Sequence, residues 1–95
     1  MPAYLIVDLD IGDVGALDEY RRRAVPILAK YGGRAIMRLG TVTVLEGDWR
    51  PKRMVGIEFP TMEALQRWYA SDDYQSLIPL RQRVARANVI AVEGV

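Results

Sequence analysis

The pattern of hydrophobic and polar residues between residues 3 and 59 predicts three β-strands. Residues 3–10 are rich in β-branched and aromatic side chains and are followed by turn-forming residues. Residues 34–46 alternate approximately, and Gly40 interrupts them, which favours a bulge. A loop is expected over residues 46–51, and residues 53–59 alternate again. The second and third strands are therefore predicted to form a hairpin.

Apolar residues recur at helical spacing between residues 17 and 31, with charged residues mostly on the other side. Asp13 is the expected N-cap of this helix. Pro26 lies inside it and removes a backbone hydrogen bond, so the axis should bend there. Gly32 supplies a left-handed stop. The pattern therefore predicts a kinked amphipathic helix that ends at Gly32.

A second helical region is expected to begin after Thr61, which is a good N-cap. Its apolar stripe is interrupted at residues 72–73, and helical spacing then resumes as far as Val84. Pro79 is best tolerated in the first turn of this new segment. We therefore expect a helix broken into two pieces, followed by a fourth strand over residues 87–93.

The predicted order is β-α-β-β-α-β, which is typical of the ferredoxin-like α+β fold with an antiparallel four-stranded sheet. The chain has 95 residues, which suits a single domain spanning residues 1–95. A domain of this size buries a limited share of its surface, so association with a second copy would help to stabilise it.

The alternating strand residues fall into two sets that we expect to face opposite sides of the sheet. The more uniformly apolar set is expected beneath the helices and comprises Leu5, Val7, Leu9, Val55, Ile57, Phe59, Ile90 and Val92. The mixed set is expected on the open face and comprises Tyr4, Ile6, Asp8, Ile36, Arg38, Met54, Gly56, Glu58, Val89, Ala91 and Glu93. The mixed set is too apolar for a solvated face, so we expect a homodimer, a dimeric α/β barrel. The alternative is a wet sheet face with scattered apolar residues.

Composition and charge exclude several classes of partner and site. The sequence is 51% hydrophobic and 26% charged, with a formal net charge of +1 and interleaved charges, which disfavours nucleic acid as a partner. No segment is long and apolar enough for a membrane helix and no signal peptide is recognised, so we expect no membrane partner and a cytoplasmic protein. The sequence has no Cys and no His. Disulfides, thiolate zinc sites, histidine triads and histidine-ligated haem are therefore excluded, and we expect no metal and no cofactor.

Several segments distributed over the whole chain resemble one bacterial family. They are residues 1–4, Tyr20, Pro26, 31–33, Arg38, 45–49, 51–53, 57–60, 68–69, 74–75, Arg81 and 92–94. This family is catalogued as domain of unknown function thirteen-thirty and belongs to the dimeric α/β-barrel superfamily. The resemblance implies the ferredoxin-like fold and a homodimer. It implies less about activity, because the superfamily ranges from cofactor-free monooxygenases to lactone isomerases and haem proteins.

Three charged residues, Asp8, Arg38 and Glu58, are predicted to point from different strands into the barrel interior. Two carboxylates around one guanidinium would have separated pKa values, and one of them would be able to shuttle a proton. The competing interpretation is a structural ion-pair network across the dimer, or exposure at a strand end. The sequence leaves both interpretations open.

Aromatic residues supply further candidates. Tyr20 is able to donate a hydrogen bond into the cleft, although its helical spacing also suits a core residue. Trp68 and Tyr69 are expected to pack the second helix on the sheet, with an aromatic lid as the alternative. Trp49 is expected to cover the hairpin loop or the dimer rim. Arg81, like the other arginines of the helices, is expected on a solvated face.

Three functions follow from these patterns. The first is a small-molecule binding domain, in which Arg38 holds an acidic or carbonyl-bearing ligand in a cleft on the open sheet face and Tyr4, Ile6 and Met54 supply apolar contacts, with Trp68 as a further candidate. The second is a cofactor-free isomerase or monooxygenase with Glu58 or Asp8 as base, Arg38 stabilising negative charge and Tyr20 orienting the substrate. The third is a structural homodimer without a ligand.

Overall fold

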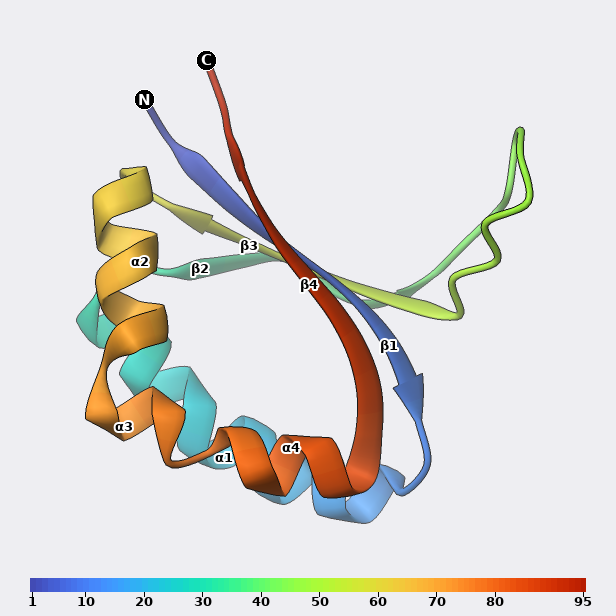
Figure 1. Ribbon diagram of the computed structural model, residues 1–95, viewed down its shortest axis with the longest axis horizontal. Helices are drawn as coiled ribbons and strands as arrows, with labels where there is room; N and C mark the ends of the chain where they lie inside the picture. Colours follow the sequence, from blue (N-terminus) through green and yellow to red (C-terminus); the bar gives the residue numbers. More distant parts are fainter.

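The computed structural model describes residues 1–95 and has the predicted ferredoxin-like α+β architecture (Figure 1). The elements in chain order are β1 (Ala3–Ile11), α1 (Val14–Lys30), β2 (Arg34–Thr41), β3 (Arg53–Phe59), α2 (Met62–Ala70), α3 (Asp72–Gln75), α4 (Ile78–Val84) and β4 (Ala85–Glu93). The helices all lie on one side of the sheet, and the loop between β2 and β3 projects away from them. No helix is both long and apolar enough to cross a membrane.

The four strands form one antiparallel sheet in the order β2-β3-β1-β4, so β3 lies between β1 and β2 as predicted. Leu5 pairs with Ile57 on β3 and with Ala91 on β4, and these three side chains share the helix-covered face. The neighbouring set, which includes Ile6 and Ile90, points to the open face. The register therefore decides which side chains the helices can cover.

The two ends of α1 are fixed by local hydrogen bonds that the sequence predicts. The Asp13 carboxylate accepts from the Ala16 backbone N–H at 3.1 Å, which caps the first turn. At the other end, Gly32 adopts φ +83° and the Gly33 N–H donates to the Leu28 carbonyl at 2.9 Å. This is a Schellman stop, and it returns the chain to the sheet at β2.

The second helical region is broken, as expected, but into three pieces, α2, α3 and α4, rather than two. Thr61 caps α2 by accepting from the Ala64 N–H at 3.0 Å. Ser71 ends α2 in an extended conformation and also caps α3, where its hydroxyl accepts from the Tyr74 N–H at 3.2 Å. Pro79 stands in the first turn of α4, where no backbone hydrogen bond is lost. The two breaks turn Tyr74 inward, where it is 2% exposed.

The predicted length of the second strand needs correction, whereas the expected irregularity near Gly40 is present. Strand β2 ends at Thr41, and residues 42–52 continue as the projecting loop, so the predicted strand over residues 34–46 is too long. The pairing with β3 shifts between Ala35 and Met37 and again between Met37 and Gly40. Leu39 adopts φ +54°, a conformation that is uncommon for a residue with a side chain. These irregularities change which way the side chains of β2 point.

The assignment of the β4 faces was wrong by one residue. Ile90 and Val92 are on the open face and are 56% and 45% exposed, whereas Val89 packs against the core. Ala91 and Glu93 share the face of Val89. Apolar residues occupy every position from 89 to 92, so alternation alone was unable to choose between the faces.

Candidate functional site

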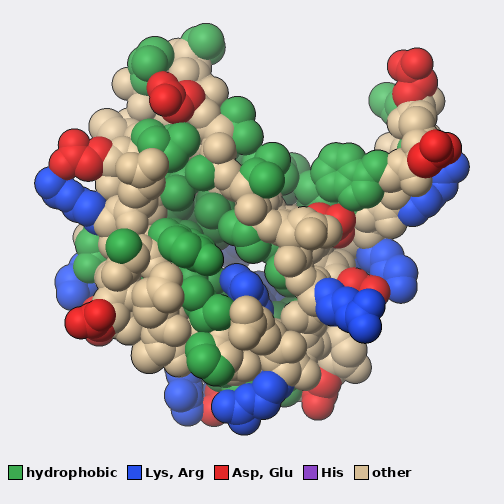
Figure 2. Space-filling view, in the orientation of Figure 1, with side chains coloured by type: hydrophobic (Ala, Val, Ile, Leu, Met, Phe, Trp, Pro, Cys, Tyr) green, Lys and Arg blue, Asp and Glu red, His purple; other side chains and the backbone are tan.

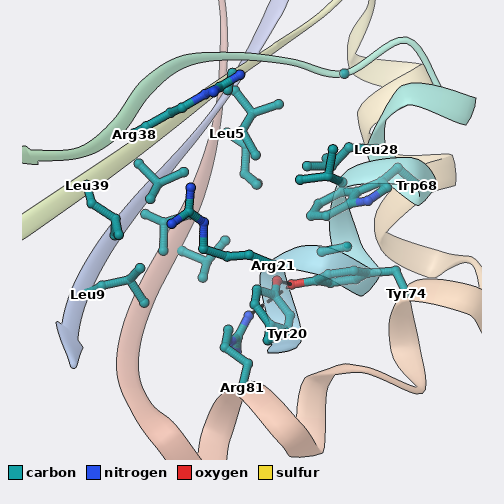
Figure 3. A pocket seen from close by; sticks show the side chains of 18 of the residues that line it. Leu5, Leu9, Tyr20, Arg21, Leu28, Arg38, Leu39, Trp68, Tyr74 and Arg81 are labelled. Atoms are coloured by element: carbon teal, nitrogen blue, oxygen red, sulfur yellow. Dashed lines mark hydrogen bonds between the residues drawn. The ribbon is translucent and has the colours of Figure 1, made fainter. Parts of the chain in front are cut away.

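A cavity of about 400 Å³ lies between α1 and the helix-covered face of the sheet (Figures 2 and 3). Its wall is mostly hydrophobic, and the α1 side is formed by Leu17, Ala24 and Leu28 among others. Leu5, Val7, Val55 and Ile57 form the opposite wall, which is the sheet. The predicted cleft was placed on the open face, so this cavity lies on the other side of the sheet.

The exposed members of the lining mark the opening of the cavity, between α1 and the edge strand β2. They include Arg21 on α1 and Arg38 on β2, both exposed. Arg34 on β2 also borders the cavity, but its guanidinium is turned to Glu58 on the open face. Arg34 is bound to Glu58 at 2.7 Å, and Arg21 is 3.8 Å from Asp18. No Asp or Glu belongs to the lining itself. Arg38 is therefore the arginine at the opening that has no carboxylate partner, and its charge attracts negatively charged molecules.

The other end of the cavity is closed by polar groups from three helices (Figure 3). The phenolic oxygens of Tyr20 on α1 and Tyr74 on α3 are 2.8 Å apart. Arg81 on α4 donates from Nη1 to the Tyr74 oxygen at 3.2 Å. Trp68 on α2 packs on Tyr74 with ring centroids 4.1 Å apart. The breaks between α2, α3 and α4 bring these helices together beside Tyr20 of α1.

Arg81 is the most unusual group in the cavity. Its exposed fraction is 9%, and it forms no ion pair. Its Nε has no hydrogen-bond partner, and Trp68 Nε1 is also buried without a partner. Buried charges in proteins are normally paired, because removal from water is costly. The closed end therefore holds a positive charge that nothing in this chain neutralises.

The Tyr20 hydroxyl remains protonated in this setting. Burial raises the pKa of Tyr20 well above its ordinary value, and the hydrogen bond with Tyr74 raises it further, while Arg81 opposes the shift. A neutral phenol donates a hydrogen bond rather than accepting a proton. At the closed end, Tyr20 is therefore suited to polarise or bind an oxygen atom.

Three of the predicted site residues line this cavity: Arg38, Tyr20 and Trp68. Tyr20 and Trp68 lie at the closed end, where Tyr20 contacts Tyr74 and Trp68 is 2% exposed. Arg38 lies at the opening rather than on the open face of the sheet, because the register shifts of β2 rotate it to the helix side. The predicted position of Arg38 among the open-face residues was therefore wrong.

Asp8 and Glu58 remain on the open face, as predicted, and neither contacts Arg38. The Asp8 carboxylate accepts from the Trp49 indole N–H at 3.1 Å. Glu58 binds Arg34 at 2.7 Å. The predicted cluster of two carboxylates around Arg38 therefore does not form within one chain, although its acidic members share one face of the sheet.

Tyr4, Ile6 and Met54 also occupy the open face and are partly buried. Desolvation raises the pKa of the Tyr4 phenol, and the Glu58 carboxylate opposite it on β3 adds to the shift. The more exposed apolar residues of β2 and β4 extend the same surface. We call this surface the open-face patch, which comprises Tyr4, Ile6, Ile36, Met37, Met54, Ile90 and Val92.

Two residues of the closed end, Tyr74 and Arg81, were not among the sequence candidates. Arg81 was expected on a solvated face, but it is buried. The sequence does indicate a buried position for Arg81, because Leu77 and Val84 precede and follow it at helical spacing. Both of these residues are buried. A charged residue inside an apolar stripe indicates either a buried ion pair or a binding group.

The comparisons with known proteins agree with this fold. A protein of unknown function from Rhodopseudomonas palustris is 17% identical with a TM-score of 0.78, covering 99% of this chain and 82% of that chain. SnoaB, a cofactor-independent oxygenase from Streptomyces nogalater, is 12% identical with a TM-score of 0.70 and coverages of 99% and 93%. A dimeric ferredoxin-like protein of unknown function from Jannaschia sp. CCS1 is 18% identical with a TM-score of 0.63 and coverages of 99% and 100%.

These low identities establish a shared fold and nothing about activity. No curated protein matches the sequence significantly. Residues 2–95, almost the whole chain, match the family described as Domain of unknown function (DUF1330). This match agrees with the resemblance seen in the sequence, and the chain belongs to the DUF1330 family.

Proposed function

We propose that this protein is a homodimer that binds a small apolar molecule carrying an acidic or carbonyl group in the cavity beneath α1. The observation that carries the proposal is a mostly hydrophobic cavity whose lining includes Arg21, Arg38 and Arg81 and no Asp or Glu. An apolar wall with a few convergent polar groups is typical of small-molecule sites.

The size of the cavity supports this proposal. Its volume of about 400 Å³ falls within the range of about 300–1,000 Å³ that is common for ligand pockets. Apolar side chains of α1, such as Leu17 and Leu28, and apolar side chains of the sheet form its two walls. Burial of an apolar ligand against both walls would supply binding energy.

The open-face patch supports the homodimer. Ile36, Met37, Ile90 and Val92 are between 40% and 56% exposed, and together they present an apolar sheet face that solvent would otherwise cover. The ferredoxin-like protein from Jannaschia sp. CCS1, which shares this fold, is described as dimeric. Packing the same face of two copies is the symmetric solution, and it leaves both cavities on the outer sides.

Native mass spectrometry of freshly purified protein tests both parts. We expect a dimer that carries a small molecule. The variant Ala24→Leu fills the cavity and should lose the adduct, because Ala24 is buried in its wall. The matched control Ala70→Leu, at an exposed position of α2 outside the cavity, should retain it.

Three results would contradict parts of this proposal. A monomer would contradict the homodimer. An adduct that both variants retain would place the ligand outside the cavity. A dimer without adduct that also fails to bind the simple aromatic acid 2-naphthoate would contradict ligand binding and leave a structural homodimer.

A second candidate function is a cofactor-free isomerase or monooxygenase. It is proposed by analogy, because SnoaB, which shares this fold, is described as a cofactor-independent oxygenase. Within this chain the carboxylates available as a base, Asp8 and Glu58, lie on the open face, so proton transfer would occur in the dimer cleft. Glu58→Gln should then abolish turnover and leave the circular dichroism spectrum unchanged, and retained turnover would exclude this role.

A further inference from the structure

The closed end of the cavity contains a cation without a counter-charge. Arg81 is 9% exposed, and its partner at 3.2 Å is the neutral hydroxyl of Tyr74. Its Nε is buried and makes no hydrogen bond. No carboxylate belongs to the cavity lining. Buried charges in proteins are normally paired, so this cation is suited to hold an anion.

The donor and acceptor of the hydrogen bond between Arg81 and Tyr74 follow from their chemistry. The guanidinium is able only to donate, so the Tyr74 oxygen accepts from it. The Tyr20 and Tyr74 oxygens share one further hydrogen bond at 2.8 Å, which uses one of the two hydroxyl protons. The second hydroxyl proton has no acceptor in the chain. Donors therefore outnumber acceptors at this point, and all three groups line the cavity.

The arginines at the opening differ from Arg81 in their setting. Arg34 is already paired with Glu58, and Arg21 is close to Asp18. Arg38 is exposed to solvent, where ion pairs contribute little. A charge at the closed end is screened much less by water and salt. The opening therefore attracts an anion, and the closed end is the place where an anion is held most strongly.

We infer that Arg81, Tyr74 and Tyr20 form a carboxylate site; this inference rests on the proposed function. The ligand is then an apolar monocarboxylic acid that enters the cavity with its acid group first. The carboxylate accepts from the unpaired N–H groups of Arg81 and from the free phenolic O–H. Two oxygen atoms with four lone-pair positions match this set of donors. The apolar body of the ligand then lies between α1 and the sheet.

A matched pair of probes tests this inference by titration calorimetry of the full chain. The acid is 2-naphthoate, and its neutral analogue of similar shape is 2-naphthalenemethanol. We expect the wild type to bind the acid at least about tenfold more tightly than the alcohol. Arg81→Met, which removes the charge, should abolish this preference and leave the affinity for the alcohol unchanged. Arg83→Gln, at an exposed position of α4 outside the cavity, is the control and should keep the preference, and Arg38→Gln tests the opening.

A purely structural Arg81 would behave differently, because its replacement would lower the melting temperature without changing the preference for the acid. We expect instead that Arg81→Met keeps or raises the melting temperature of the ligand-free protein, since it removes an unpaired buried charge. Arg81→Gln is a second variant in case Arg81→Met does not fold, because it keeps a donor for Tyr74 and loses the charge. It should also lose the preference.

The outcomes separate the two proposals. Binding of both probes with equal affinity, or a preference for the acid that survives both Arg81 variants, would overturn the carboxylate site and leave the binding cavity intact. Binding of neither probe would overturn the proposed function itself. Loss of the preference in Arg38→Gln but not in the Arg81 variants would move the anion site to the opening.

Discussion

The phenolic oxygens of Tyr20 and Tyr74 lie 2.8 Å apart although 54 positions separate the two residues in the chain. This contact joins α1 to α3 across the closed end of the cavity (Figure 3). The Tyr74 oxygen also accepts from Arg81, so the two hydroxyls are not equivalent. Tyr74 lies at the centre of the cluster and Tyr20 at its edge.

Removing the Tyr74 hydroxyl should therefore lower the free energy of unfolding more than removing the Tyr20 hydroxyl. Tyr20→Phe deletes one buried hydrogen bond and should lower the free energy of unfolding by about 1 kcal/mol. Tyr74→Phe also leaves Arg81 without its acceptor and should cost about 2–3 kcal/mol. Urea unfolding of both variants and of the double variant measures these values and their coupling. A larger loss for Tyr20→Phe would contradict the arrangement.

The raised pKa of Tyr20 predicts a pH dependence at the alkaline end. The folded state keeps the Tyr20 proton above the ordinary tyrosine pKa of 10.0, whereas the unfolded state releases it. The stabilisation from this residue is therefore complete below about pH 10 and decreases as the pH rises, by up to about 1.4 kcal/mol per pH unit. Urea unfolding between about pH 9 and about pH 11 should show a smaller slope in Tyr20→Phe than in the wild type. Equal slopes would show that Tyr20 is exposed.

The turn at Gly32 should tolerate no side chain. Gly32 has φ +83°, and a Cβ atom there would lie 3.1 Å from the ring of Pro60. Gly32→Ala is therefore expected to lower the free energy of unfolding by about 1–2 kcal/mol. Gly40→Ala is the control, because no atom lies within 4 Å of the added Cβ and its φ is not in the left-handed region. An effect of Gly40→Ala as large as that of Gly32→Ala would contradict this explanation.

The open-face patch predicts which substitution separates two copies. Ile90 pairs with Ile6 across β4 and β1 and is 56% exposed on that face. Ile90→Glu would bury a charge in the proposed interface, so the variant should be a folded monomer by light scattering at micromolar concentration. Val14→Glu changes another exposed apolar residue, at the start of α1, and should remain dimeric. A dimeric Ile90→Glu variant would contradict an interface on this face.

The fold was predictable from the sequence because local signals agreed with the global pattern. Asp13 and Thr61 cap the helices, Gly32 ends α1, and the order of elements fits one architecture. The faces of β4 were not predictable, since four successive apolar residues satisfy either register. The pairing with β1, a long-range interaction, chose between them.

The candidate site was predictable only in part. Tyr20 and Trp68 line the cavity, and the sequence indicates both as candidate site residues. Arg38 was chosen for the wrong face, because two register shifts and the positive φ of Leu39 cannot be derived from alternation. Arg81 was assigned to solvent although its helical spacing with buried residues indicated the core.

The central claim is that the cavity beneath α1, and not the open face, holds an acidic apolar molecule. Two-dimensional amide NMR spectra recorded during titration of the protein with 2-naphthoate test it most directly. We predict shift changes centred on Ala24, Ile57 and Arg81, which surround the cavity. Changes centred on Ile6 and Ile90, or no changes at all, would contradict the claim.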